Sequence, residues 1–107
     1  MSNHIHITDF FVTGFKYYEG CMVFNKLKIG TELKLVRETE NRYEPEAVAI
    51  YFQESKIGFI PRSENNIISK FIDQGYADAF EVRCNRILPE AAPNHQVGVV
   101  IFLKKLK

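Results

Sequence analysis

The sequence predicts an α+β domain that is mostly β: an antiparallel, OB-like β barrel of about six strands, with one main helix and room for a second, short one. Segments rich in β-branched and aromatic residues recur along the chain and are separated by turn-forming residues. Apolar residues at helical spacing occur in one segment. The length of 107 residues suits one domain over residues 1–107, which would bury roughly 65% of its unfolded surface.

Residues 4–14 predict a first long strand, because polar and apolar residues alternate loosely there and β-branched and aromatic residues are frequent. The residues expected to pack inward are Ile5, Ile7, Phe11 and Val12. Gly14 ends or kinks this strand. The composition of the segment from Phe15 to Gly20 then predicts a bend. Not all of its aromatic residues, which include two tyrosines, are needed to fill the core.

Three further strands are predicted before residue 61. Residues 31–37 alternate polar with apolar, as in a strand half exposed to water. Residues 47–52 and 56–60 flank a three-residue connection, residues 53–55, and predict a hairpin. Gly58 in the second arm indicates a bulge or a close approach of the backbone to a ligand.

The main helix is predicted after this hairpin. Pro61 stops the second arm, and Ser63 is a good N-cap. The apolar residues at helical spacing are Ile67, Ile68, Phe71 and Ile72. Gly75 supplies a left-handed stop. Residues 79–88 and 97–103 predict two closing strands, separated by a polar loop that contains proline.

The net charge of +1 excludes a protein that coats long nucleic acid through electrostatics alone, because such domains usually have a pI above about 9. Four acids crowd the loop before the predicted hairpin: Glu38, Glu40, Glu44 and Glu46. Any contact with nucleic acid must therefore be local, and a short end suits this charge better than a long duplex.

No apolar run approaches the roughly 20 residues needed to span a bilayer, and the first residues lack a basic and then apolar leader. We therefore expect a soluble protein of the cytoplasm that does not contact membranes. Cys21 and Cys84 lie far apart in the chain, and we expect both to be small buried hydrophobes rather than a disulfide.

Aromatic and charged residues gather at the ends of several predicted strands. They are Lys16, Tyr17, Tyr18, Asn41, Tyr43, Glu44 and Arg62. A barrel can bring such ends together. Exposed rings can stack on unpaired bases at about 1–3 kcal/mol each, and nearby cations can meet phosphates. A carboxylate repels phosphate but can accept a hydrogen bond from a sugar hydroxyl, which favours a free 3′ end.

Three motifs in this order resemble the HIRAN domain, a small β module found alone in bacteria and attached to eukaryotic fork-remodelling helicases. They are FVTGFKYYEG at 11–20, NRYEPEAVAI at 41–50 and KIGFIPR at 56–62. The resemblance implies a module that binds the 3′-hydroxyl end of single-stranded DNA in repair or replication-linked processes. It also implies that the domain itself catalyses no reaction.

The positions that match the family's motifs are Lys16, Tyr17, Asn41, Tyr43, Glu44, Phe59 and Arg62. Lys16 stands where helicase members carry Arg, so a forked phosphate contact becomes a point-charge contact. Glu44 replaces the commoner Asp and is one methylene longer. Phe59 takes a position that is often Tyr or His, which removes a polar group, while Arg62 keeps a positive charge for phosphate.

No catalytic, cofactor or metal site is predicted. Nucleophile motifs such as GxSxG are absent from the sequence. His4 and His6 share one face of a strand and could hold a metal with His95 or a cysteine, but terminal histidines are usually solvated. The sequence has no GxxxxGK[ST], so remodelling of a strand would need a helicase or nuclease acting in trans.

Two alternatives stay open. The first is structural: Asn41 is a turn residue, Tyr43 packs under Pro45, and Tyr17 or Tyr18 caps the core. Arg62 then pairs with Glu64 or with the acids near Glu44. The second is functional: a Tyr-rich rim or an exposed strand edge receives a protein partner, which the near-zero net charge favours.

Overall fold

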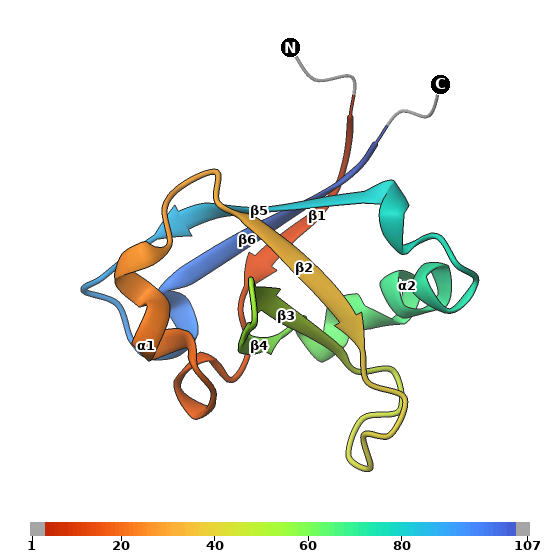
Figure 1. The fold of residues 1–107 in the computed structure, drawn as a ribbon, viewed down its shortest axis with the longest axis horizontal. Helices are drawn as coiled ribbons and strands as arrows, with labels where there is room; N and C mark the ends of the chain where they lie inside the picture. Colours follow the sequence, from red (N-terminus) through yellow and green to blue (C-terminus); the bar gives the residue numbers. More distant parts are fainter. Residues whose placement is uncertain (1–3, 105–107) are drawn as a thin grey trace.

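A six-stranded antiparallel sheet curls around the apolar core (Figure 1). The computed structural model describes residues 4–104. The strands are β1 Ile5–Phe11, β2 Glu32–Arg37, β3 Val48–Phe52, β4 Ser55–Phe59, β5 Phe80–Ile87 and β6 Val97–Leu103. The helices are α1 Gly20–Val23 and α2 Arg62–Asp73, with 3-10 turns η1 Phe15–Tyr17, η2 Phe24–Lys26, η3 Ala77–Ala79 and η4 Pro93–His95. The predicted strands and the main helix are all present.

The strand order is β1-β6-β5-β2-β3-β4, so β1 and β4 are the two ends of the sheet. These ends meet at one point. Thr13, just after β1, forms an isolated bridge with Phe59, the last residue of β4, through two N–H to O bonds of 2.9 Å. The prediction of a barrel therefore holds only in part: the strand pairing forms an open, curled sheet, and a single isolated bridge joins its two ends. The ladder is also short between β2 and β5, where two residue pairs are in register.

Gly58 permits this closure. Its φ is +150°, and a Cβ at this position would lie 2.4 Å from Val12 Cγ1 and 2.5 Å from the Thr13 carbonyl oxygen. No side chain fits in that space. The predicted bulge is confirmed by a register shift in the β3–β4 ladder between Ile50 and Tyr51. The backbone at Gly58 is also approached closely, by Val12 and Thr13 of the segment that follows β1.

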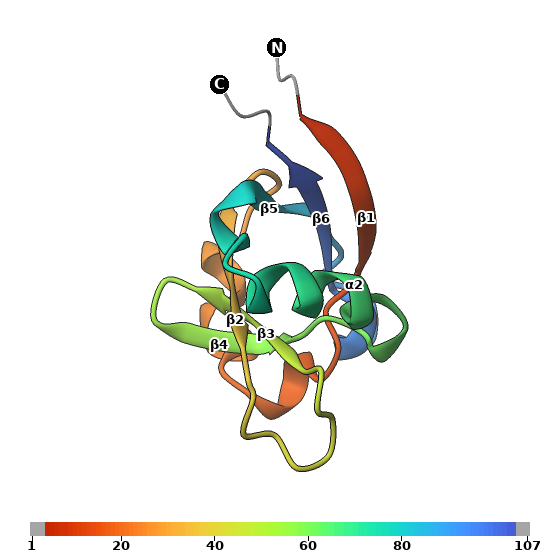
Figure 2. The ribbon, with the colours of Figure 1, turned by 90° about the vertical axis from the view of Figure 1, so that its right-hand side faces the viewer.

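Helix α2 lies across the open side of the curled sheet, between its β5–β6–β1 part and its β2–β3–β4 part (Figure 2). Its N-cap is Pro61 and makes no side-chain cap bond, so the prediction of Ser63 as N-cap is wrong. The predicted left-handed stop is confirmed: Gly75 has φ +92° and donates its N–H to the Ile72 carbonyl. The next N–H reaches the Phe71 carbonyl, which completes a Schellman motif.

Some apolar residues predicted to face the core are exposed instead. They are Ile5, Ile7, Ile67 and Phe71. Strand β1 ends the sheet and carries a register shift between His6 and Thr8, so its alternation does not persist. In α2 the buried residues are Asn65, Ile68 and Ser69, which turns Ile67 outward. Val12 is buried as predicted, because it lies at the closing point of the sheet.

The hairpin turn and the cysteines also differ from expectation. Ser55 pairs with Phe52, so the connection has two residues, and Gln53 takes the positive φ of 54° that such a tight turn requires. Both cysteines are free, but Cys21 is exposed and Cys84 alone is buried. Burial raises the pKa of the Cys84 thiol to about 11, so it stays protonated and unreactive. No helix within residues 4–104 is long and apolar enough to cross a membrane.

Replacing Gly58 with Ala should destabilise the protein by about 1–3 kcal/mol, because the new Cβ would collide with backbone and strain a positive φ. The matched control is Gly30→Ala, since Gly30 has φ +93° but nothing within 4 Å of the added Cβ. Urea unfolding of the two variants measures the difference. Equal losses would mean that the closing contact adds nothing beyond backbone strain.

Candidate nucleic-acid interface

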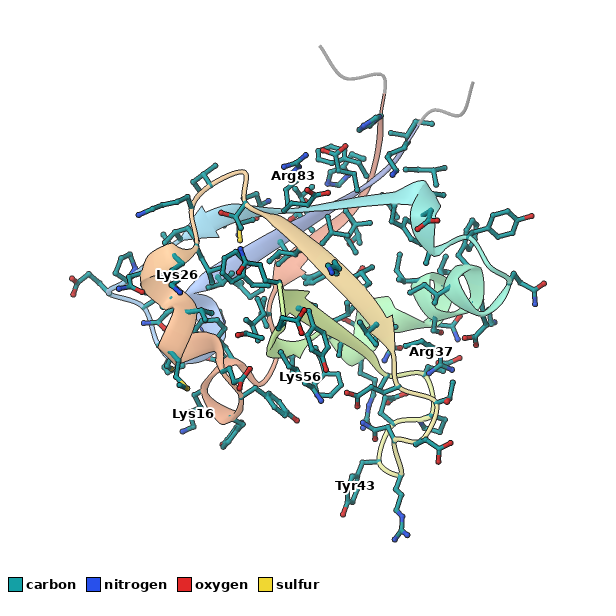
Figure 3. All side chains as sticks on the ribbon, in the orientation of Figure 1. Lys16, Lys26, Arg37, Tyr43, Lys56 and Arg83 are labelled. Carbon is teal, nitrogen blue, oxygen red and sulfur yellow. The ribbon has the colours of Figure 1, made fainter. Side chains whose placement is uncertain are left out.

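A cleft opens where the closing bridge meets the loop between β2 and β3. It has a volume of about 260 Å³. Its walls come from the bend after β1, the loop and the junction of β4 with α2: Thr13, Tyr18, Asn41, Tyr43, Glu44, Ala47, Phe59, Ile60, Arg62 and Asn65. In Figure 3 the labelled Lys16, Lys56 and Tyr43 all lie along the lower side of the molecule.

Five of the seven residues expected at the site line this one cleft: Asn41, Tyr43, Glu44, Phe59 and Arg62. Lys16 and Tyr17 do not. They line a neighbouring hollow together with residues of the loop before β6. The turn η1 separates the two spaces, with Thr13 and Tyr18 on the cleft side and residues 14–17 on the other side.

Asn41 shapes the loop from within. Its Oδ1 accepts the backbone N–H groups of both Tyr43 and Glu44 at 2.9 Å, and its Nδ2 donates to Glu38 at 3.3 Å. The interpretation of Asn41 as a turn residue is therefore confirmed. Most of its hydrogen-bonding capacity is used inside the loop, although its side chain also borders the cleft.

Tyr43 projects from the tip of the same loop. Its side chain is 89% exposed, so the expectation that it packs under Pro45 is wrong. Tyr17 is 74% exposed and Tyr18 is 40% exposed. Neither Tyr17 nor Tyr43 is sunk in the interior, so both rings can meet a ligand from solvent.

Arg62 pairs with Glu44 across the mouth of the cleft. The distance between Arg62 Nε and Glu44 Oε1 is 2.5 Å, and Arg62 Nη2 also approaches the Tyr43 carbonyl at 3.5 Å. Glu64, the other acid considered as a partner, instead accepts a hydrogen bond from Thr8. An ion pair this exposed is worth about 0–1 kcal/mol, so a ligand can rearrange it at little cost.

Lys56 joins the three segments beneath the cleft. Its ammonium lies 4.6 Å from the centre of the Tyr18 ring and 4.4 Å from that of Phe59. The two rings meet edge to face at 5.5 Å. Lys56 also forms an ion pair with Glu38 at 2.5 Å. Sequence reasoning did not assign Lys56 a role, because its partners lie on segments far apart in the chain.

Asn65 is the cleft residue that sequence reasoning missed most clearly. It is a polar residue only 2% exposed, in the first turns of α2, and its side chain lines the cleft. It shares the buried face of the helix with Ile68 and Ser69. An asparagine three residues before Ile68, on the core-facing side of a helix, was the signal available in the sequence.

The three histidines have neighbouring side chains, and the rings of His4 and His6 both lie near that of Phe102. His4 lies 2.7 Å from Glu81, and His6 lies 2.8 Å from Asp9. His95 packs edge-on against a phenylalanine ring. Within the described residues no group of three His, Cys, Asp or Glu side chains is placed to hold a metal ion.

Comparison with protein families matches residues 5–104 to the HIRAN domain. The chain belongs to the HIRAN family. HIRAN domains form a family of DNA-binding modules with an OB-like fold, and the match covers nearly all of the curled sheet and α2.

Two solved structures resemble this HIRAN domain in fold. A protein from Lactobacillus plantarum matches with a TM-score of 0.79 and 19% identity, over 94% of each chain. The HIRAN domain of human HLTF matches with a TM-score of 0.62 and 15% identity, over 95% of this chain and 81% of that one. No curated protein sequence matches the chain.

Replacing Asn41 with Ala should loosen the loop, because two backbone N–H groups lose their acceptor. At about 1 kcal/mol per hydrogen bond, exchange of the Tyr43 and Glu44 amide protons should accelerate about fivefold. Hydrogen exchange followed by NMR measures this. Asn41→Asp keeps the acceptor oxygen and should stay within about threefold of the parent; equal acceleration in both variants would contradict the role assigned to Oδ1.

Proposed function

We propose that this HIRAN domain binds the 3′-hydroxyl end of single-stranded DNA, without catalysis, in repair or replication-linked processes. The observation that carries the proposal is the cleft itself, where Tyr43 and Glu44 of one loop share a single space with Arg62 from the start of α2. Each of these groups suits a different part of a terminal nucleotide: the base, the phosphate and the sugar.

The aromatic rings account for base binding. Tyr43 offers an exposed ring at the mouth of the cleft, and the half-exposed Tyr18 ring stands on its other wall. Stacking on such rings tolerates any base. Tyr18 is held by Phe59 and Lys56, so little of its freedom is lost when a base packs against it.

The cations account for phosphate binding. Arg62 uses Nε to hold Glu44 and Nη2 to approach the Tyr43 carbonyl, and its side chain is 76% exposed, so Nη1 remains available for a phosphate. Lys16 lies beside Tyr17 in the neighbouring hollow, with its ammonium 5.2 Å from the ring centre. We assign Lys16 and Tyr17 to a nucleotide further from the 3′ end.

Glu44 accounts for the preference for a hydroxyl end. One carboxylate oxygen binds Arg62, and the other accepts the Glu46 N–H at 3.2 Å. A carboxylate has about four acceptor sites, so it can still receive a hydrogen bond from a sugar hydroxyl. A terminal phosphate in the same place would be repelled.

The size of the cleft supports recognition of an end. A volume of about 260 Å³ is just below the roughly 300–1,000 Å³ of typical small-ligand pockets. Such a space suits one terminal nucleotide better than a run of bases. A helicase or nuclease acting in trans, in the cytoplasm, would then process the bound strand.

An oligonucleotide with a 3′-hydroxyl should bind at least tenfold more tightly than the same strand with a 3′-phosphate, as measured by fluorescence anisotropy at low salt. Glu44→Gln removes the repelling charge but keeps a hydrogen-bond acceptor, and it should narrow this preference to about threefold or less. Equal, weak binding of both strands by the parent protein would remove the proposal of end recognition.

Tyr43→Ala should weaken binding by about 1–3 kcal/mol, or roughly 5- to 150-fold in Kd, if the ring stacks on a base. The matched control is Tyr76→Ala, because Tyr76 is also exposed but contacts Phe71 at the far end of α2. The same anisotropy titration measures both variants. Similar affinities for the two would show that the loop tyrosine is not a stacking platform.

A second candidate function is a protein-interaction module. Its support is strand β1, which ends the sheet and presents Ile5 and Ile7 to solvent. An unpaired strand edge with apolar side chains can receive a strand from another protein. Recovery of one partner protein after nuclease treatment, with no DNA shift at low salt, would select this function.

A further inference from the structure

The Asn65 side chain is a buried polar group that faces the cleft. Asn65 is 2% exposed and lines the cleft together with Asn41, Glu44 and Arg62. No hydrogen bond found among residues 4–104 uses its side-chain amide. The Asn65 amide atoms are not among the fully buried side-chain polar atoms that lack a partner, so they reach the space of the cleft, and a ligand that brings both a donor and an acceptor can bind them there.

The side-chain amide of Asn41, which also lines the cleft, cannot bind the ligand in this way. Its Oδ1 already accepts two backbone N–H groups, and its Nδ2 already donates to Glu38. Glu44 and Arg62 hold one another and carry charges suited to the sugar and the phosphate. Of the two carboxamides that line the cleft, Asn65 is therefore the one whose donor and acceptor are both uncommitted.

We propose that Asn65 pairs with the Watson–Crick edge of the 3′-terminal base. This inference rests on the proposed function and adds to it the group that reads the base. The Tyr43 ring stacks on the face of the base, while the Asn65 amide meets its edge at the buried end of the cleft. Because a complementary strand would occupy that edge, this contact can form only when the last base is unpaired.

The chemistry of a carboxamide makes this contact tolerant of base identity. Adenine and cytosine present an amino donor beside a ring-nitrogen acceptor, whereas guanine and thymine present a ring N–H donor beside a carbonyl acceptor. A carboxamide has one acceptor oxygen and one NH₂ donor, and turning it over exchanges their places. One asparagine can therefore match any of the four bases, provided that no complementary strand occupies the edge.

The test combines removal of the Asn65 amide with removal of the 3′-terminal base. Asn65→Leu keeps a similar volume but removes both polar groups, and the ligands are a single-stranded oligonucleotide and the same strand with an abasic 3′-terminal nucleotide. Wild-type protein should bind the normal strand at least tenfold more tightly than the abasic one. The variant should show a ratio at least threefold smaller, and the four terminal bases should bind wild type within about threefold of one another.

The matched control is Asn66→Ala, because Asn66 is the exposed neighbour on α2 and donates to Glu46 outside the cleft. It should keep the wild-type ratio. Thermal unfolding checks that Asn65→Leu remains folded. If it does not, the side-chain amide signal of Asn65 in ¹⁵N-labelled wild-type protein gives the answer, since it should shift with the normal strand and not with the abasic one.

The outcomes separate this inference from the proposed function. If wild type prefers 3′-hydroxyl ends but Asn65→Leu keeps the full base-to-abasic ratio, or the Asn65 amide signal does not respond, the role of Asn65 is overturned while end recognition stands. If wild type binds no 3′ end, both are overturned.

Discussion

The pairing of Thr13 with Phe59 is the contact on which the rest of this structure depends. It joins the two ends of the curled sheet and sets the bend after β1 against the β4–α2 junction. Gly58 makes it possible, because any side chain there would meet Val12 and the Thr13 carbonyl. Tyr18 follows Thr13 and Arg62 follows Phe59, so this bridge brings together two of the segments that line the cleft.

Charges around the cleft are compensated locally. Arg62 faces Glu44, and Lys56 faces Glu38 at the base of the loop. The net charge of +1 therefore reflects a surface in which the cations near the cleft have acidic neighbours. A site of this kind gains little from releasing counterions, so its affinity should depend on stacking and on hydrogen bonds to one nucleotide. A protein that coats a strand would instead draw most of its affinity from counterion release.

The strands and the main helix were predictable because alternation, turn residues and helical spacing are local signals. Tyr18 was passed over in favour of Tyr17 because a 3-10 turn follows neither period, so the sequence does not indicate which ring faces the cleft. Ile5 was expected to face the core because apolar and polar residues alternate in β1. The sequence does not indicate that β1 is an edge strand or that its register shifts between His6 and Thr8. The roles of Lys56 and Asn65 depend on distant partners, which no local pattern encodes.

In the proposed function, one cleft receives the end of a DNA strand. The most direct measurement is NMR shift mapping of ¹⁵N-labelled protein titrated with a short single strand that carries a 3′-hydroxyl. The account predicts that the largest shifts fall on the amides of Tyr18, Tyr43, Glu44 and Arg62, with smaller ones at Lys16 and Tyr17. Shifts confined to strand β1, or no saturable shifts at all, would contradict it.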